Sequence, residues 1–273
     1  LINEFGGDFT KFLITESSFS VRGRKGVGVV PPMDPNTQDT SLLIGSEDIS
    51  KLDLYPEDDP RVLSLNGAFN VGNRGIVEFV EVFKNEIESL HTMITATQEK
   101  SVPSPGKQAM IYFDGVILAH CNEAEWNKFK AEHTNEAILD RIVRVNVPYC
   151  LEVDQEVRIY EKLIGRSDFD SHIAPHTLQV AAMFSVLSRL KPSNKVDALT
   201  KMKIYNGQEI VEKGLIKKVD IRDLREEVED EGMTGISTRF IMKAIDAALA
   251  DSTKNMITPI SIRESLIKQV KEQ

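Results

Sequence analysis

Cysteine is scarce in this sequence, since its 273 residues include only Cys121 and Cys150 and no CxxC pair. A disulfide framework and a cysteine zinc knuckle are therefore excluded, and we expect both residues to be thiols in a reducing compartment. Long apolar runs are also missing, because stretches such as 116–119 and 180–186 are far shorter than the roughly 20 residues of a spanning helix. Without a basic and apolar export signal at the N-terminus, we expect a cytoplasmic protein with no membrane partner.

Basic residues are fewer than acidic ones: 33 lysines and arginines against 42 aspartates and glutamates give a formal net charge of −9. A broad basic surface for nucleic acid is therefore not expected. The hydrophobic share of 41% and charged share of 27% are typical of a globular chain rather than a disordered one. The length favours one large or two small domains. The sequence begins with Leu1 and not methionine, so we expect a fragment of a longer protein.

Several catalytic motifs are absent. There is no G-x-x-x-x-G-K-[ST] phosphate loop, no G-x-S-x-G elbow and no H-E-x-x-H metal motif, whose residues bind phosphates, present a serine nucleophile and hold zinc. The glycine-rich stretch 23–28 therefore reads as a plain loop, and His120 as a core residue. His172 and His176 have the i, i+4 spacing of zinc ligands on one helix, but the upstream Asp168 and Asp170 can equally cap that helix. We predict no metal site.

The apolar pattern divides the chain into two parts near residue 150. In 1–150, residues 76–83 form a buried strand or a helix start, with a helical pattern continuing to 99. Residues 109–113 and 116–121 bracket Asp114-Gly115 and predict a hairpin whose second strand is buried. A helix is expected at 123–135, and a β-branched strand at 142–147 that Pro148 ends. The turn-forming sequence 72–75 precedes the first of these strands.

Residues 151–273 show helical patterns only. The expected helices cover 154–164, 175–190, 195–205, 221–231, 237–250 and 258–270. Ser237 is a candidate N-cap for the fifth of them, and Pro259 suits the first turn of the last. An α/β part is therefore followed by an all-helical part.

Two polar residues follow apolar strands. Glu81 ends the run 75–81, and Asn122 follows the run 116–121. A carboxylate at the tip of a buried strand can polarise a water for attack on a γ-phosphate, and an amide beside it can orient the same water. A glutamate on a buried strand or an arginine between helices is also commonly only structural, so the order of features along the chain is the stronger argument.

Two arginines extend this order. Arg141 lies between a helix and a strand, where its guanidinium could reach transition-state charge across a subunit boundary. Arg144 competes with it three residues later, within the strand; we prefer Arg141. Arg239 lies in the first turn of the expected helix 237–250.

The order of these features resembles the AAA+ ATPases: Walker B, sensor 1, arginine finger, then a helical lid with a sensor 2. More closely, the chain resembles the PrkA family, the bacterial serine protein kinases. The resembling stretches cover nearly the whole chain: 59–61, 72–81, 97–99, 119–123, 147–149, 158–162, 172–178, 230–233 and 235–237. The sequences Asn73-Arg74-Gly75 and His172-Ile-Ala-Pro-His-Thr177 are the specific ones.

This resemblance implies a fold and a set of roles. The fold is α/β, with residues 1–150 the distal part of an AAA+ P-loop NTPase core (a parallel sheet flanked by helices) and 151–273 an all-helical lid. Glu81 would be the Walker-B glutamate, Asn122 the sensor-1 residue, Arg141 the arginine finger and Arg239 the cofactor-binding sensor-2 arginine. Two features depart from the family: the Walker-B pair is Val80-Glu81, and no Walker A is present.

The resemblance therefore implies an enzyme that binds ATP with Mg²⁺. It would form a homo-oligomeric ring, and it would phosphorylate or remodel protein substrates. Glu78 is a candidate substitute for the missing Walker-B aspartate, although on a regular strand it would point to the other face. The family's C-terminal kinase-like region is expected to be absent. The alternative is a non-catalytic oligomerisation or docking module, with the acidic stretch 225–231 as its contact surface.

Overall fold

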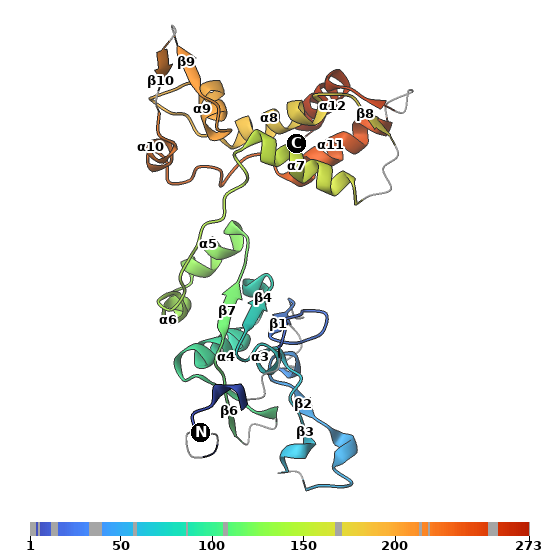
Figure 1. Cartoon of the computed structure of the whole chain (residues 1–273), viewed down its shortest axis with the longest axis vertical. Coiled ribbons are helices and arrows are strands. Elements are labelled where there is room, and N and C mark those ends of the chain that lie inside the picture. The colour runs from blue at the N-terminus through green and yellow to red at the C-terminus, as the bar shows by residue number, and fades with distance from the viewer. Residues whose placement is uncertain are drawn as a thin grey trace. The chain divides into compact units, whose positions relative to one another are not determined.

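The structure is a computed structural model, shown in Figure 1. It describes residues 4, 6–11, 16–32, 40–56, 59–85, 87–105, 109–166, 171–212, 215–217, 219–250 and 256–272. These residues form two compact units, 1–143 and 144–273, which are described separately below. No described helix is both long and apolar enough to cross a membrane.

The first unit is built on a parallel sheet of three strands in the order β1-β4-β7. The strands are β1 (Val27–Val30), β4 (Ile76–Phe79) and β7 (Val116–Ala119). Val27 is in register with Ile76, and Ile76 with Val116, so the three carboxyl ends lie at one edge. The expected parallel sheet flanked by helices is therefore confirmed.

The other elements of this unit are short. Two antiparallel pairs join β2 (Ser46–Glu47) to β3 (Leu63–Ser64) and β5 (Ser101–Pro103) to β6 (Met110–Tyr112). The helices are α2 (Ser41–Ile44), α3 (Ala68–Val71), α4 (Ile87–Gln98), α5 (Glu123–Ala131) and α6 (Glu136–Leu139). Single 3-10 turns are η1 (Phe9–Lys11), η2 (Ile49–Lys51), η3 (Pro60–Val62), η4 (Val82–Lys84) and η6 (His133–Asn135).

One face of the sheet is buried and the other is not. Val77 and Phe79 are fully buried, and the ring of Phe79 lies 5.9 Å from that of Phe69, which also contacts Phe113 edge-on. On the opposite face Val116 and Leu118 are more than half exposed. The expectation that 116–121 is a buried strand is therefore wrong: among the described strands, β7 is an edge strand that pairs with β4 alone.

The predicted hairpin is also wrong, because β6 pairs with β5 while β7 pairs with β4. Residues 72–75 form the expected turn, and the side chain of Asn73 in this turn accounts for the different pairing. The Asn73 side chain donates to the Tyr112 carbonyl oxygen at 3.1 Å and accepts from the Asp114 backbone at 2.9 Å. The turn at Asp114 is thereby bound to Asn73, so the strands on its two sides separate into different sheets.

Two further expectations differ from the structure. The helical pattern expected from 78 to 99 is a helix only in α4, because β4 extends to Phe79 and η4 follows. The strand expected at 142–147 does not form. Val143, Val145 and Val147 are at least three-quarters exposed, since no described strand pairs with this segment.

Close backbone contacts fix the amino ends of the sheet. A Cβ added at Gly75 would overlap the carbonyl oxygen of Gly26 in the neighbouring chain segment. We predict that Gly75→Ala destabilises this unit by about 1–3 kcal/mol, because backbone and not a flexible side chain must move. Gly23→Ala, where the Cβ would meet only the Ser20 side chain, is the control. Chemical denaturation measures both, and equal midpoints would contradict the prediction.

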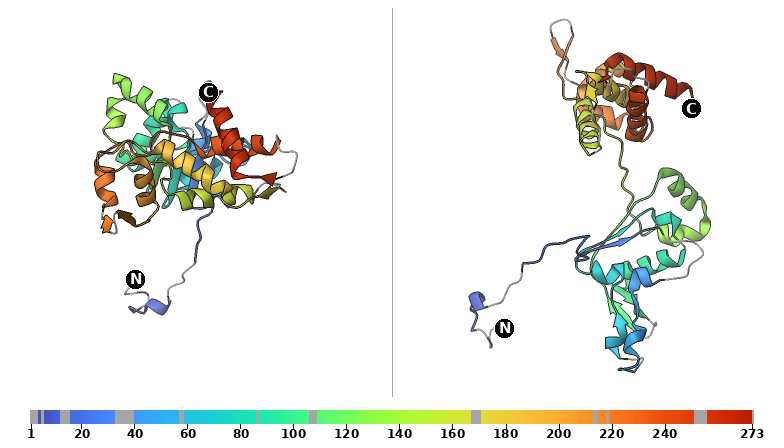
Figure 2. Two further views of the ribbon diagram at one scale, coloured as in Figure 1. Left: turned by 90° about the horizontal axis from the view of Figure 1, so that it is seen from above. Right: turned by 90° about the vertical axis from the view of Figure 1, so that its right-hand side faces the viewer.

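The second unit is mainly helical, as expected. Its helices are α7 (Val153–Ile164), α8 (Thr177–Arg189), α9 (Ala198–Tyr205), α10 (Ile221–Glu226), α11 (Thr238–Ala250) and α12 (Pro259–Lys271). They appear in yellow-green to red in Figure 2. Two short ribbons that the periodicity does not predict join β8 (His172–Ile173) to β11 (Met256–Ile257) and β9 (Ile210–Glu212) to β10 (Leu215–Lys217).

The core of the second unit lies among α7, α8, α11 and α12. Tyr160, Val186, Ile241 and Ile262 are fully buried there. The Ser237 side chain accepts a hydrogen bond from the Phe240 backbone at 3.3 Å, which confirms it as the cap of α11. Thr258 and Ser261 form a reciprocal capping box at the start of α12.

Candidate functional site

Glu81 lies two residues beyond the end of β4, at the carboxyl edge of the sheet. Its backbone is left-handed, with φ 49° and ψ 54°, a conformation that costs a non-glycine residue about 1–3 kcal/mol and is concentrated at functional sites. The turn is held from both sides: the Val80 backbone donates to Val30, and Val82 donates to the carbonyl of His120. The carboxylate of Glu81 is therefore displaced from the strand direction and is partly exposed.

Asn122 lies at the same edge, after β7. It is the N-cap of α5, and its side-chain oxygen accepts from the Glu125 backbone at 2.8 Å. Lys84 connects Glu81 to the start of α5. Its ammonium group lies 2.6 Å from the Glu81 carboxylate and 3.8 Å from the carboxylate of Glu125, the residue whose backbone Asn122 caps. The hydrogen bond to Glu81 raises the pKa of Lys84 above its usual value. The structure thus brings Glu81 and Asn122 to one polar edge.

Glu78 lies on β4 itself, on the face opposite to the buried Val77 and Phe79. Its carboxylate is 3.6 Å from the imidazole of His120, and both side chains are about half exposed. His120 is therefore not the core residue that we expected. Glu78 and Glu81 do not alternate along one regular strand as we expected, because β4 ends at Phe79 and Glu81 lies beyond it.

Arg141 follows α6 and is exposed. Its guanidinium donates to the carbonyl oxygen of Ala137, in the same helix. The expected helix-to-strand junction is a helix end followed by extended chain, since the strand is missing. Among the described residues of the first unit, no hydrogen bond or ion pair joins Arg141 to Glu81 or Asn122. Arg144 begins the second unit.

Arg239 lies in the first turn of α11, as expected, and its side chain is exposed. The first turn of a helix presents unpaired backbone N–H groups and a positive dipole end, which favour anions.

The two histidines of the specific sequence 172–177 do not share a helix. His172 lies in β8, whereas His176 precedes α8 in a left-handed conformation and contacts Gln179 at 3.0 Å. Zinc binding by an i, i+4 pair requires both histidines on one helix, and these two residues do not meet that requirement. Asp168 and Asp170 lie outside the described residues. Within the described part of the chain, no group of three acidic, histidine or cysteine residues could hold a metal ion.

The stretch 59–61, another part of the resemblance, has a structural role. Asp59 caps η3 by accepting from the Arg61 backbone at 2.9 Å, and its carboxylate also binds the Arg61 guanidinium. These bonds from Arg61 lower the pKa of Asp59 to about 2. The hydrogen bonds between Asp59 and Arg61 thus stabilise the 3-10 turn η3 locally.

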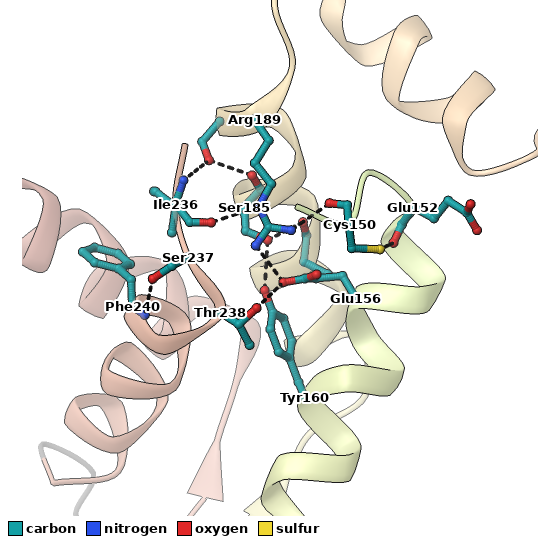
Figure 3. Close-up of polar contacts among 12 residues, drawn as sticks. Cys150, Glu152, Glu156, Tyr160, Ser185, Arg189, Ile236, Ser237, Thr238 and Phe240 are labelled. Carbon is teal, nitrogen blue, oxygen red and sulfur yellow. Dashed lines mark hydrogen bonds and ion pairs between the residues drawn. The ribbon is translucent and has the colours of Figure 1, made fainter. Parts of the chain in front are cut away.

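A buried network in the second unit was not predicted (Figure 3). Arg189 and Glu156 form an ion pair at 2.8 Å with both side chains at most 1% exposed. The helical spacing of the buried residues Ala182, Ser185 and Arg189 in α8 is the signal that could have found it. A charged residue on the buried stripe of a helix requires a partner.

Cys150 lies at the edge of this network, and burial raises the pKa of its thiol. Because the thiolate is the reactive form, we predict that iodoacetamide at pH 8 alkylates Cys150 more slowly than the exposed Cys121. Peptide mass spectrometry over time measures the two rates. In urea the difference should vanish, and equal rates in the folded protein would contradict the prediction.

Two family models together match nearly the whole chain. The family model described as "PrkA AAA domain" matches residues 1–197, and the one described as "PrkA serine protein kinase C-terminal domain" matches residues 199–273. The expectation that the family's C-terminal region is absent is therefore wrong, because part of it begins within the predicted lid. The sequence pattern could not show this, since both regions are helical here.

Two curated relatives match along nearly the full chain. "Serine/threonine kinase YeaG" of Escherichia coli (strain K12) is 38% identical over 275 residues, which is 100% of this chain and 42% of the relative. "ATP-dependent protease PrkA" of Bacillus subtilis (strain 168) is 39% identical over 270 residues, 97% of this chain and 42% of the relative. The chain thus spans well under half the length of these relatives. Among solved structures, NtrX from Brucella abortus aligns with a TM-score of 0.42 and 13% identity, covering 91% of this chain and 58% of that one.

Proposed function

Because the chain belongs to the PrkA family of serine protein kinases, we propose that it is part of an ATP-binding AAA+ module. The gene product that carries it would bind ATP with Mg²⁺ in the bacterial cytoplasm and hydrolyse the nucleotide. The energy would serve to phosphorylate or remodel protein substrates. The curated relatives carry the names of a kinase and of an ATP-dependent protease, so we infer ATP turnover first and the fate of the substrate second.

One observation carries this proposal: Glu81 and Asn122 lie after adjacent parallel strands, at the same carboxyl edge of the sheet. In open α/β sheets ligands bind outside the carboxyl ends of the strands. The left-handed backbone of Glu81 supports the same reading, because a strained carboxylate at a strand end is typical of a functional site.

The proposed chemistry assigns each residue a step. The Glu81 carboxylate polarises a water and accepts its proton while the Asn122 amide orients that water toward the γ-phosphate. Lys84 pairs with Glu81 and has to release it for this step. Arg239, exposed at the start of α11, contacts the phosphates, and Arg141 stabilises transition-state charge from a neighbouring subunit.

Magnesium fits this site only as a companion of the nucleotide. Val80 occupies the place of the usual Walker-B aspartate, and the described residues offer no three-ligand cage. Mg²⁺ is commonly held by one or two carboxylates together with substrate phosphates. When bound, the ion would neutralise phosphate charge, and Glu81 or Glu78 would be the carboxylate of this chain that helps to hold it.

The docking-module alternative has little support. Its proposed contact surface, 225–231, is partly turned inward, since Glu231 is 7% exposed and pairs with Lys201 at 2.6 Å. Glu227 accepts from Ser193 and from the Asn194 backbone. These bonds lower the pKa of Glu227.

A subunit-mixing experiment tests the proposal. We expect Arg141→Ala and Glu81→Gln full-length gene products each to lose ATP hydrolysis, because each removes one half of a shared site. Mixed in equal amounts, they should regain part of it, since some interfaces then carry both intact residues. Phosphate release measures the rates, and Arg144→Ala is the matched control. Full hydrolysis by Arg141→Ala, or by a gene product with no phosphate loop anywhere upstream, would contradict the proposal.

A further inference from the structure

Arg189, the last residue of α8, holds three separate chain segments with its guanidinium (Figure 3). It donates to the Ile236 carbonyl oxygen at 2.9 Å, to the Cys150 carbonyl oxygen at 2.8 Å and to the Glu156 carboxylate at 2.8 Å. Its side chain is fully buried. One side chain therefore connects the start of the second unit, α7 and the loop that leads into α11.

The loop before α11 is fixed residue by residue. The Ile236 backbone donates to the Ser188 hydroxyl at 2.9 Å, and the Thr238 hydroxyl donates to the same Glu156 oxygen at 3.2 Å that Arg189 binds. Gly235 has φ +115°, and a Cβ there would lie 2.7 Å from the Ser188 carbonyl oxygen. The three residues nearest to Arg239 on its N-terminal side thus have bonds that set the direction of the first helical turn.

The segment at the start of the unit is held by the same end of α8. The Tyr149 backbone donates to Gly232 at 2.9 Å, and Gly232 donates to the Arg189 carbonyl oxygen at 3.3 Å. The guanidinium of Arg189 also lies 4.9 Å from the centre of the Tyr149 ring. The chain entering the unit and the chain entering α11 are therefore bound to one residue.

We infer that Arg189, acting through Glu156 and Thr238, is a positioning residue for Arg239. It fixes the first turn of α11 and so holds the exposed guanidinium of Arg239 where a nucleoside triphosphate binds. The inference rests on the proposed ATP site. It goes further because it assigns a nucleotide-affinity role to buried side chains that do not touch the nucleotide.

A second buried ion pair in the same unit provides the comparison. Lys201 and Glu231 lie 2.6 Å apart with side chains at most 5% exposed, and Glu231 also accepts from the Lys191 backbone. Among the described residues, the side-chain hydrogen bonds of this pair reach Lys191 and not the loop 235–239. Glu231→Gln and Glu156→Gln therefore make the same chemical change in two equally buried pairs, only one of which leads to Arg239.

The main test uses Thr238, because its hydroxyl can be removed with little change of shape. In the full-length gene product, we expect Thr238→Val to weaken ATP binding about tenfold, equivalent to about 1.4 kcal/mol. Thr238→Ser, which keeps the hydroxyl, should bind as the wild type does. Isothermal titration with a non-hydrolysable ATP analogue gives the dissociation constants.

Two further measurements separate positioning from simple stability. In an Arg239→Ala background Thr238→Val should have no additional effect, since residues that act through one another are non-additive. Glu156→Gln should weaken ATP binding, whereas Glu231→Gln should lower the denaturation midpoint and leave ATP affinity unchanged. Amide exchange in 236–241 should be faster in Thr238→Val than in Glu231→Gln, with or without nucleotide.

The outcomes are distinct. Wild-type affinity in Thr238→Val, or an undiminished effect in the Arg239→Ala background, would overturn the inference and leave the ATP site intact. Failure of the wild-type gene product to bind the analogue would instead overturn the proposed function, and the inference with it.

Discussion

Glu81→Gln is expected to reduce ATP hydrolysis by the full-length gene product about 100-fold or more, because positioned acid–base groups contribute at least that factor. Binding of ATP should persist, since the amide has the same shape and removes only the ability to accept the proton from water. Phosphate release under saturating ATP measures turnover, and titration with the nucleotide measures affinity.

The control for this change is Glu47→Gln, which replaces a carboxylate in β2, outside the polar edge that carries Glu81. It should hydrolyse ATP at the wild-type rate. A Glu81→Gln protein that turns over normally would remove Glu81 from the mechanism. A collapse of turnover in Glu78→Gln alone would instead assign the carboxylate role to Glu78, which lies on β4 beside His120.

Arg189→Met is expected to destabilise the second unit by about 3–5 kcal/mol, the usual cost of leaving a buried charge without its partner. The Glu156 carboxylate is 1% exposed, and without Arg189 it would keep the hydrogen bond from the Thr238 hydroxyl but lose its cationic partner. The carbonyl oxygens of Cys150 and Ile236 would lose their donors as well. The midpoint of denaturation in urea measures the loss.

Two variants calibrate that result. Arg158→Met makes the same change at an exposed position of α7 and should alter stability by no more than about 0.5 kcal/mol. Replacing Glu156 and Arg189 together should recover part of the loss, because no unpaired charge remains. If Arg189→Met and Arg158→Met unfold at the same urea concentration, the buried pair does not hold the unit together.

Local patterns predicted the elements on which the candidate site depends. The β-branched run before Glu81 and the apolar run before Asn122 are strands β4 and β7, and both polar residues follow strand ends at one edge. The helices of the second unit were predictable because their apolar residues repeat at helical spacing and Ser237 caps α11. These features depend on neighbours in sequence, which a pattern can show.

The errors concern neighbours in space. Nothing near Asp114 indicates that its backbone binds the Asn73 side chain, so the hairpin prediction was reasonable locally and wrong in three dimensions. The β-branched residues at 142–147 predict a strand, yet a strand forms only where a second strand can pair with it. Likewise, the left-handed backbone of Glu81 and its pairing with Lys84 arise from the turn that joins β4 to η4.

A structure of the Glu81→Gln full-length gene product trapped with ATP and Mg²⁺ would show where the nucleotide binds. We expect the γ-phosphate beside Gln at position 81 and Asn122, with Arg239 on the phosphates and Arg141 of an adjacent subunit approaching the same group. Nucleotide bound away from the carboxyl edge of the β1-β4-β7 sheet, with Asn122 only capping α5, would contradict this expectation.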